Sequence, residues 1–320
     1  MIRRRTALAF GLGLLAPSAP VATRSAAAQG APAGSAVASF SILADIMREI
    51  AGPRMAVTSL APVGADMHKF QPRPSDVRTV TQAKVFVING LGLEGWAERL
   101  AEAASFRGRA VVATRGLAAL PAAPDHAHGH GHGAKTSGTH QHGQSAFDPH
   151  AWQDVANMRV YVANIRDGMQ AADAAGAAVY NARAEALLRS LDMLDAEIRA
   201  MLAPIPRATR RVVTTHEAFT YYGDAYGVDF LAPVGLSGDR EPSPREFAAL
   251  IAQIRRERIR ALFVEQGASS RLLEQISRET GVRIGGTLYA DTLSPAGGPA
   301  ATYAAMMRHN TTLLVQALSG

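Results

Sequence analysis

Histidine is the residue type whose distribution in this sequence most clearly indicates chemistry. Ten histidines occur among 320 residues, and cysteine is absent. Six of them lie in one short segment, whereas His68, His150 and His216 stand apart, each where a strand or loop is expected to give way to a helix. In open parallel sheets, ligands bind at the carboxyl ends of the strands, where such junctions lie. Three neutral imidazoles that converge there with one oxygen ligand would form a tetrahedral zinc site.

The oxygen ligand of such a site has two candidates besides water. Asp291 follows the last strand expected in the chain, a position that suits a cleft, although a turn or helix-capping aspartate is the alternative interpretation. Glu265 ends the apolar run 262–264 and can either bind the metal or hydrogen-bond His216 from behind. Each histidine taken alone fits an isolated surface or core position. Their joint placement, in a chain with an export signal and a histidine-rich tract, favours a metal site.

Residues 121–146 form a tract in which histidine alternates with glycine, serine and threonine. Its few apolar side chains cannot bury enough surface to offset the entropy of ordering, so we expect a flexible loop. The histidines of this loop, which we expect to bind further metal weakly, are His126, His128, His130, His132, His140 and His142. We favour a role of this loop as a local reservoir or transfer site for metal. The alternative is a low-complexity segment that arose by sequence drift and has no role in transport.

Short apolar strands alternate with helices on both sides of this loop. The first set of expected strands comprises 37–40, 55–60, 85–88 and 110–113, and the second set comprises 211–214, 229–232, 261–264 and 282–284. Such alternation predicts βαβ units and parallel sheets.

A long helix is expected between the two sets. Residues 174–203 contain no proline. Their apolar side chains recur at helical spacing, at Leu187, Leu191, Leu194, Ile198 and Met201. This pattern predicts one helix of about 45 Å. The apolar repeat covers only about two heptads, fewer than the three or four expected of a coiled-coil dimer. We therefore expect a monomeric α/β protein with two (β/α)4-type lobes, 34–173 and 208–320, joined by one long rigid helix.

Residues 1–28 have the pattern of a secretory signal peptide. Arginines at 3–5 precede an apolar run over 7–17, and small residues at 26–28 form a cleavage site. The run is too short to span a bilayer, and no later stretch reaches about 18 apolar residues, so we expect no stable membrane insertion of the mature chain. A membrane anchor is the competing interpretation, and the arginine pair also permits twin-arginine export. Without a cysteine for lipid attachment, a free periplasmic location is expected.

The remaining patterns do not support other activities. The signal carries four arginines and no acid, so its removal lowers the formal charge from +6 to +2. The dense basic cluster at 255–260 contains Glu257 and is typical of a solvated helix face, so no nucleic-acid partner is expected. Residues 90–95 fit the glycine spacing of a dinucleotide fingerprint but lack the acidic residue about 20 positions later. His309 is expected to be exposed on the last helix.

Six segments resemble the zinc/manganese solute-binding proteins of ABC importers, the ZnuA/TroA-like (cluster A-I) family. They occur in family order over nearly all of the chain after the signal, at 62–76, 89–96, 148–152, 215–219, 263–265 and 288–294. The resemblance implies two lobes joined by a rigid helix. It also implies that His68, His150 and His216 bind the metal and that Asp291 completes the coordination. The implied partner is an ABC permease and its ATPase in the inner membrane.

The resemblance also implies a receptor for Zn²⁺ rather than an enzyme. Family members selective for manganese tend to carry a carboxylate where this chain has His216, and the histidine-rich loop is typical of the zinc branch. Some zinc-branch members carry a glutamate where Met67 stands, which leaves Asp291 or water as the oxygen donor. Imidazole suits zinc, which binds more tightly than manganese, although copper and nickel compete on affinity. A manganese receptor or adhesin of the same fold, and a zinc hydrolase, are the alternatives.

Overall fold

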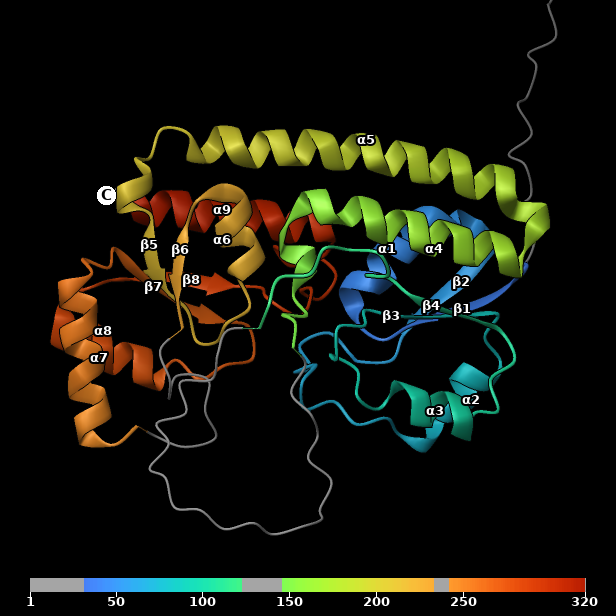
Figure 1. Ribbon diagram of the computed structural model, residues 1–320, viewed down its shortest axis with the longest axis horizontal. Coiled ribbons are helices and arrows are strands. Elements are labelled where there is room, and N and C mark those ends of the chain that lie inside the picture. Colours follow the sequence, from blue (N-terminus) through green and yellow to red (C-terminus); the bar gives the residue numbers. More distant parts are fainter. Residues whose placement is uncertain (1–31, 123–145, 233–241, 320) are drawn as a thin grey trace, which may run out of the picture. The chain divides into compact units, whose positions relative to one another are not determined.

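A computed structural model of the protein describes residues 32–122, 146–232 and 242–319 (Figure 1). The signal peptide expected over residues 1–28 and the six histidines of the expected loop lie outside these ranges. The prediction that those histidines bind metal therefore stays a prediction.

The first half of the chain forms a sheet of four parallel strands in the order β2-β1-β3-β4. The strands are β1 (Gly34–Ala38), β2 (Met55–Ser59), β3 (Val85–Ile88) and β4 (Arg109–Val112). The accompanying helices are α1 (Ser41–Ala51), α2 (Pro74–Thr81), α3 (Ala97–Ala103) and α4 (Met158–Ala172). β3 is an unbroken apolar run with its first three residues buried, as expected of a parallel strand covered on both faces.

The second half repeats this topology with the strand order β6-β5-β7-β8. The strands are β5 (Arg211–Val213), β6 (Asp229–Leu231), β7 (Ala261–Glu265) and β8 (Ile284–Leu288). The helices are α6 (Thr220–Tyr226), α7 (Pro244–Arg256), α8 (Arg271–Thr280) and α9 (Tyr303–Leu318). Two parallel four-stranded sheets with helices confirm the fold class expected from the alternation of strands and helices.

The last strand lies later in the chain than expected. Residues 282–284 were the predicted strand, but β8 runs to Leu288 through two glycines, which have low intrinsic strand propensity. A Cβ added at Gly285 would lie 2.5 Å from the ring of Phe263, so glycine allows the close approach of β8 to β7. The later strand end places Asp291 only three residues beyond the sheet.

The long helix α5 (Ala177–Leu202) has 26 residues, which corresponds to about 39 Å. It contacts α1, α4 and α9, and Figure 1 shows it running along these helices. Three residues of its predicted stripe are buried, namely Leu191, Leu194 and Ile198. Leu187 is partly buried, and Leu202 is buried in place of the expected Met201.

One large hydrophobic core includes buried residues from both sheets and from α5. A second, smaller core lies under α7 and α8 and includes Leu250, Ile254 and Leu273. Because the two halves share interior packing, we expect ligand binding to cause small adjustments rather than a wide hinge movement.

Arg210 ties the end of α5 to the start of the second sheet. It is 7% exposed, and its guanidinium donates to the carbonyl oxygens of Leu202, Ile205 and Tyr226 at 2.8–2.9 Å. Leu202 and Tyr226 are the last residues of α5 and α6, where helical carbonyls lack intrahelical partners. A buried cation thus satisfies the carboxyl ends of two helices.

Candidate metal site

The loops that follow three parallel strands carry three of the predicted ligands. His68 lies in the loop after β2, His216 in the loop after β5 and Asp291 in the loop after β8. His150 immediately precedes a 3₁₀ turn, Ala151–Gln153, that leads toward α4. Sheet topology therefore brings residues from both halves of the chain to one place.

The structure brings all four predicted side chains together. Each offers one nitrogen or oxygen atom to a group in which all atoms lie within 4.8 Å of one another. Nε2 of His68 lies 3.2 Å from Nε2 of His150. Oδ2 of Asp291 lies 3.3 Å from Nε2 of His216 and 3.8 Å from Nε2 of His68. Oδ1 of Asp291 lies 3.5 Å from Nε2 of His150.

These separations fit a small divalent cation. In a tetrahedron with metal–ligand bonds of about 2.0–2.1 Å, ligand atoms lie about 3.3–3.4 Å apart. The buried atoms Nε2 of His216 and Oδ1 of Asp291 have no hydrogen-bond partner. Buried polar atoms normally have a hydrogen-bond partner. Two buried atoms without one, in the same group of four side chains, are expected where a cation binds.

Asp148 orients His150, a role that the sequence analysis missed. Its Oδ1 lies 2.7 Å from Nδ1 of His150 and also accepts the His150 backbone N–H at 2.9 Å. A neutral imidazole that donates from Nδ1 to this carboxylate presents an unprotonated Nε2 to the site. The spacing Asp-Pro-His was the available signal, since a carboxylate two residues before a histidine can bond both its ring and its backbone.

Glu265 lies behind His216 rather than among the four converging atoms. Its Oε2 contacts Nδ1 of His216. Its Oε1 accepts three hydrogen bonds at 2.8 Å, from the backbone N–H and hydroxyl of Thr215 and from the backbone N–H of His216. Of the two oxygen candidates, Asp291 is thus the one placed to contact a cation, and Glu265 is placed to orient the imidazole.

His68 is the least enclosed member of the group. Its side chain is 42% exposed, compared with 5% for His150 and 26% for His216. Its backbone N–H donates to Oδ1 of Asp66, which forms a tight turn, and the flanking Met67 and Phe70 are buried. The loop is anchored on either side of His68, whose imidazole reaches the group with Nε2 but stays partly exposed.

The electrostatics of the group favour a cation. Burial alone would raise the pKa of Asp291, but the nearby charges of His150, His216 and His68 lower it well below its ordinary value. Burial would lower the pKa of His216, yet the nearby carboxylates of Asp291 and Glu265 raise it well above the ordinary value. Burial lowers the pKa of His68. Because protons compete with a metal ion for the imidazole nitrogens, metal affinity should fall as the pH falls.

The loop that carries Asp291 is fastened to the first half of the chain. The carbonyl oxygen of Ala290 accepts hydrogen bonds from the side chains of Trp152 and Gln153. The hydroxyl of Thr292 accepts from the backbone N–H of Gly64 at 2.8 Å. The backbone N–H of Leu293 donates to the hydroxyl of Ser41 at 3.0 Å. Asp291 therefore lies in the second half of the sequence, but the residues on either side of it are hydrogen-bonded to the first half.

The glycine-rich turn at 89–95 also supports the site. The amide of Asn89 donates to the carbonyl oxygen of Pro149, which directly precedes His150, at 2.9 Å. The buried carboxylate of Glu94 accepts from the backbone N–H groups of Asn89 and Gly90 and from the hydroxyl of Ser39. The segment that fitted a dinucleotide spacing thus forms a turn that packs against the His150 segment.

We expect Glu265→Gln to weaken metal binding by about 10- to 100-fold. The three donors around Oε1 would hold the oxygen of the glutamine amide there, so its NH₂ group would face Nδ1 of His216. That NH₂ would donate to Nδ1 and shift the imidazole proton to Nε2, the atom that faces the site. Competition with a chromophoric chelator measures the affinity. A variant that binds as tightly as wild type would contradict this role.

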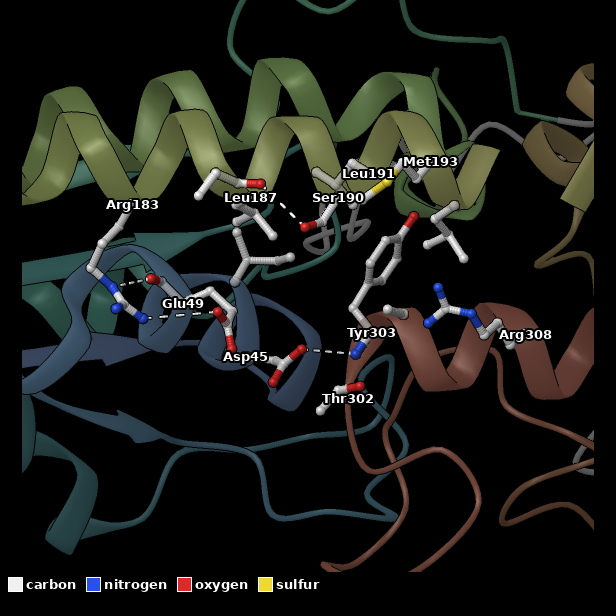
Figure 2. A pocket seen from close by; sticks show the side chains of 14 residues that line it. Asp45, Glu49, Arg183, Leu187, Ser190, Leu191, Met193, Thr302, Tyr303 and Arg308 are labelled. Atoms are coloured by element: carbon white, nitrogen blue, oxygen red, sulfur yellow. Dashed lines mark hydrogen bonds and ion pairs between the residues drawn. The ribbon is translucent and has the colours of Figure 1, made fainter. Parts of the chain in front are cut away.

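A hollow of about 440 Å³ lies between α1, α5 and the start of α9 (Figure 2). Arg183 pairs there with Glu49, and Asp45 accepts the backbone N–H of Tyr303 at 2.8 Å. Among the described residues, the metal-binding geometry is found in the group around Asp291 and not in this hollow. His309, expected to be exposed, is instead half-buried on α9, with Nε2 lying 3.1 Å from the carbonyl oxygen of Thr287.

Residues 36–317 match a family model described as the periplasmic component A of a zinc-uptake complex, ZnuA. The chain belongs to this family. Membership makes the protein a periplasmic metal-binding component of an ABC metal-uptake system, which confirms the family resemblance. In the described part of the chain, no helix combines the length and apolar character needed to cross a bilayer.

Relatives within the family differ in the metal for which they are named. The manganese-binding lipoprotein MntA of Halalkalibacterium halodurans is 36% identical over 88% of both chains. The iron-binding protein YfeA of Yersinia pestis is 33% identical over 85% of this chain and 82% of its own. The periplasmic zinc-binding protein TroA of Treponema pallidum has a solved structure that superposes with a TM-score of 0.75 at 26% identity, covering 89% of this chain and 99% of TroA. These names do not confirm the zinc branch predicted from the sequence.

Proposed function

We propose that the protein captures Zn²⁺ between its two halves with His68, His150, His216 and Asp291 and delivers it to a membrane permease. The observation that supports this is the convergence of three imidazole nitrogens and one carboxylate within 4.8 Å. Imidazole nitrogen is a preferred zinc ligand, and a given site binds zinc more tightly than manganese. Four protein ligands would fill a tetrahedral zinc site, which would leave no coordination position for an attacking water and so disfavours a hydrolase.

Manganese is a second candidate cargo with support of similar weight. Both oxygens of Asp291 face histidines, Oδ1 toward His150 and Oδ2 toward His216. A carboxylate that binds through both oxygens would raise the coordination number, and carboxylate ligands suit manganese. A relative with 36% identity is named for manganese binding.

Thermal unfolding of the metal-free protein with added zinc or manganese tests the proposal. Because ligands come from both halves, metal should stabilise the folded state by about 4 kcal/mol at a free concentration of 1,000 Kd. We expect a rise in the thermal midpoint with either metal, and at equal concentrations a larger rise with zinc. An equal or larger rise with manganese would assign that metal as cargo. An unchanged midpoint with both metals would reject the site.

The remaining predictions from the sequence stay part of this proposal. The two lobes are assigned to 34–173 and 208–320, with 174–203 as the connecting helix. The protein would act as a monomer in the periplasm after removal of residues 1–28, with residues 121–146 as an auxiliary metal-binding loop.

A further inference from the structure

Gln153 contacts the backbone next to two of the proposed ligands. Its backbone N–H donates to the carbonyl oxygen of His150 at 3.1 Å, within the 3₁₀ turn. Its side-chain NH₂ donates to the carbonyl oxygen of Ala290 at 2.9 Å. That oxygen belongs to the peptide unit that joins Ala290 to Asp291. Gln153 therefore bridges the two segments that carry His150 and Asp291. Gln153 and Ala290 are 137 positions apart in the sequence.

The same carbonyl oxygen is fixed from a second side. The indole Nε1 of Trp152 donates to the oxygen of Ala290 at 2.9 Å. The carbonyl oxygen of Trp152 in turn accepts the hydroxyl of Tyr303, whose backbone N–H is held by Asp45 (Figure 2). Trp152 and Gln153 are fully buried, so these hydrogen bonds do not compete with water. The peptide unit before Asp291 has two donors on one oxygen and little freedom to rotate.

Gln153 is a poor choice for stability alone. Its Oε1 atom is buried and has no hydrogen-bond partner. An unpaired buried acceptor destabilises the folded state, and an apolar side chain of the same shape would avoid that penalty. Polar groups that lower stability without an evident structural return are concentrated at functional sites.

We propose that Gln153 is a positioning residue that holds Asp291 against His150 so that both face the cation before it arrives. This inference rests on the proposed function. Gln153 does not itself contact the metal in this role; it fixes the peptide unit from which the carboxylate projects. Without that hydrogen bond, Asp291 would sample more orientations, and metal binding would have to restrict them.

Gln153→Met tests the inference because methionine has similar length and removes both the donor and the unpaired acceptor. We expect the metal-free thermal midpoint to stay within about 4 °C of wild type. We expect zinc affinity, measured by chelator competition, to weaken by about tenfold. The visible absorption spectrum of the Co²⁺-loaded protein should also change, because it reports ligand geometry. The matched control is Gln170→Met, which removes an amide donor to Asn181 on the surface of α4 and should leave affinity and spectrum unchanged.

A double-mutant cycle keeps the test valid if Gln153→Met proves less stable than expected. In an Asp291→Ala background, the substitution should have no further effect on zinc affinity, because the carboxylate that it positions is gone. An equal loss of affinity in both backgrounds would show a general structural role and overturn the inference. Unchanged affinity and spectrum in Gln153→Met alone would also overturn it. Failure of the wild-type protein to bind either zinc or manganese would instead reject the proposed function.

Discussion

Replacing His216 with alanine should weaken zinc binding by about 100- to 1,000-fold. Structural zinc sites with four ligands bind with about 10–16 kcal/mol, so one ligand of four accounts for about 2.5–4 kcal/mol. Nε2 of His216 is buried, has no hydrogen-bond partner and lies 3.3 Å from Oδ2 of Asp291. Its removal takes one ligand atom away from the metal, and alanine offers no atom to replace it. Chelator competition on the metal-free protein at constant pH measures the change.

His309→Ala is the matched control for this substitution. Among the described residues, His309 is the histidine outside the converging group, and its Nε2 faces the carbonyl oxygen of Thr287. We expect zinc affinity to change by less than about threefold in this variant, because substitutions far from a site have little effect on it. If His216→Ala and His309→Ala bound zinc alike, His216 would not be a ligand.

Replacing Arg210 with methionine should lower the free energy of unfolding of the metal-free protein by about 3–5 kcal/mol. The substitution leaves the carbonyl oxygens of Leu202, Ile205 and Tyr226 without their donor in a site where Arg210 is 7% exposed. It also removes a positive charge from the carboxyl ends of α5 and α6. Urea unfolding followed by circular dichroism measures the change.

The neighbouring arginine supplies the control for that prediction. The side chain of Arg211 is 43% exposed and pairs with Asp229 at 3.2 Å on the surface. Exposed ion pairs contribute about 0–1 kcal/mol, so Arg211→Met should change stability little. Equal stability of the two variants would mean that the guanidinium of Arg210 is not what secures the ends of these helices.

Local patterns in the sequence were sufficient to predict most of the strands and helices and the three histidines that the structure brings together. Apolar runs such as β3 and the helical repeat of α5 depend on neighbours within a few residues, so a single sequence reveals them. The end of β8 was misplaced because glycine has low strand propensity, whereas the close approach of Gly285 to Phe263 depends on tertiary packing.

The contacts that orient the ligands could not be predicted in the same way. The hydrogen bonds from Trp152 and Gln153 to Ala290 join segments more than 130 positions apart, and no periodicity or spacing marks such a pair. Asp148 lies two positions from His150, but its bond to the imidazole depends on the ring orientation that the fold imposes. The choice between zinc and manganese depends on fine geometry and on metal supply, which residue types alone do not encode.

The fastening of residues 290–293 to the first half of the chain bears on how cargo leaves. The loop of Asp291 is hydrogen-bonded to the half that carries His68 and His150, although it also remains joined to β8 three residues away. His216 lies on the second half, where Glu265 at the end of β7 contacts its imidazole. A movement of the β5–β7 edge that carried His216 and Glu265 away would remove one imidazole and leave the ligand atoms of His68, His150 and Asp291 together. Release of the ion would then begin with the loss of one metal–ligand bond, while the other three ligand side chains keep their arrangement.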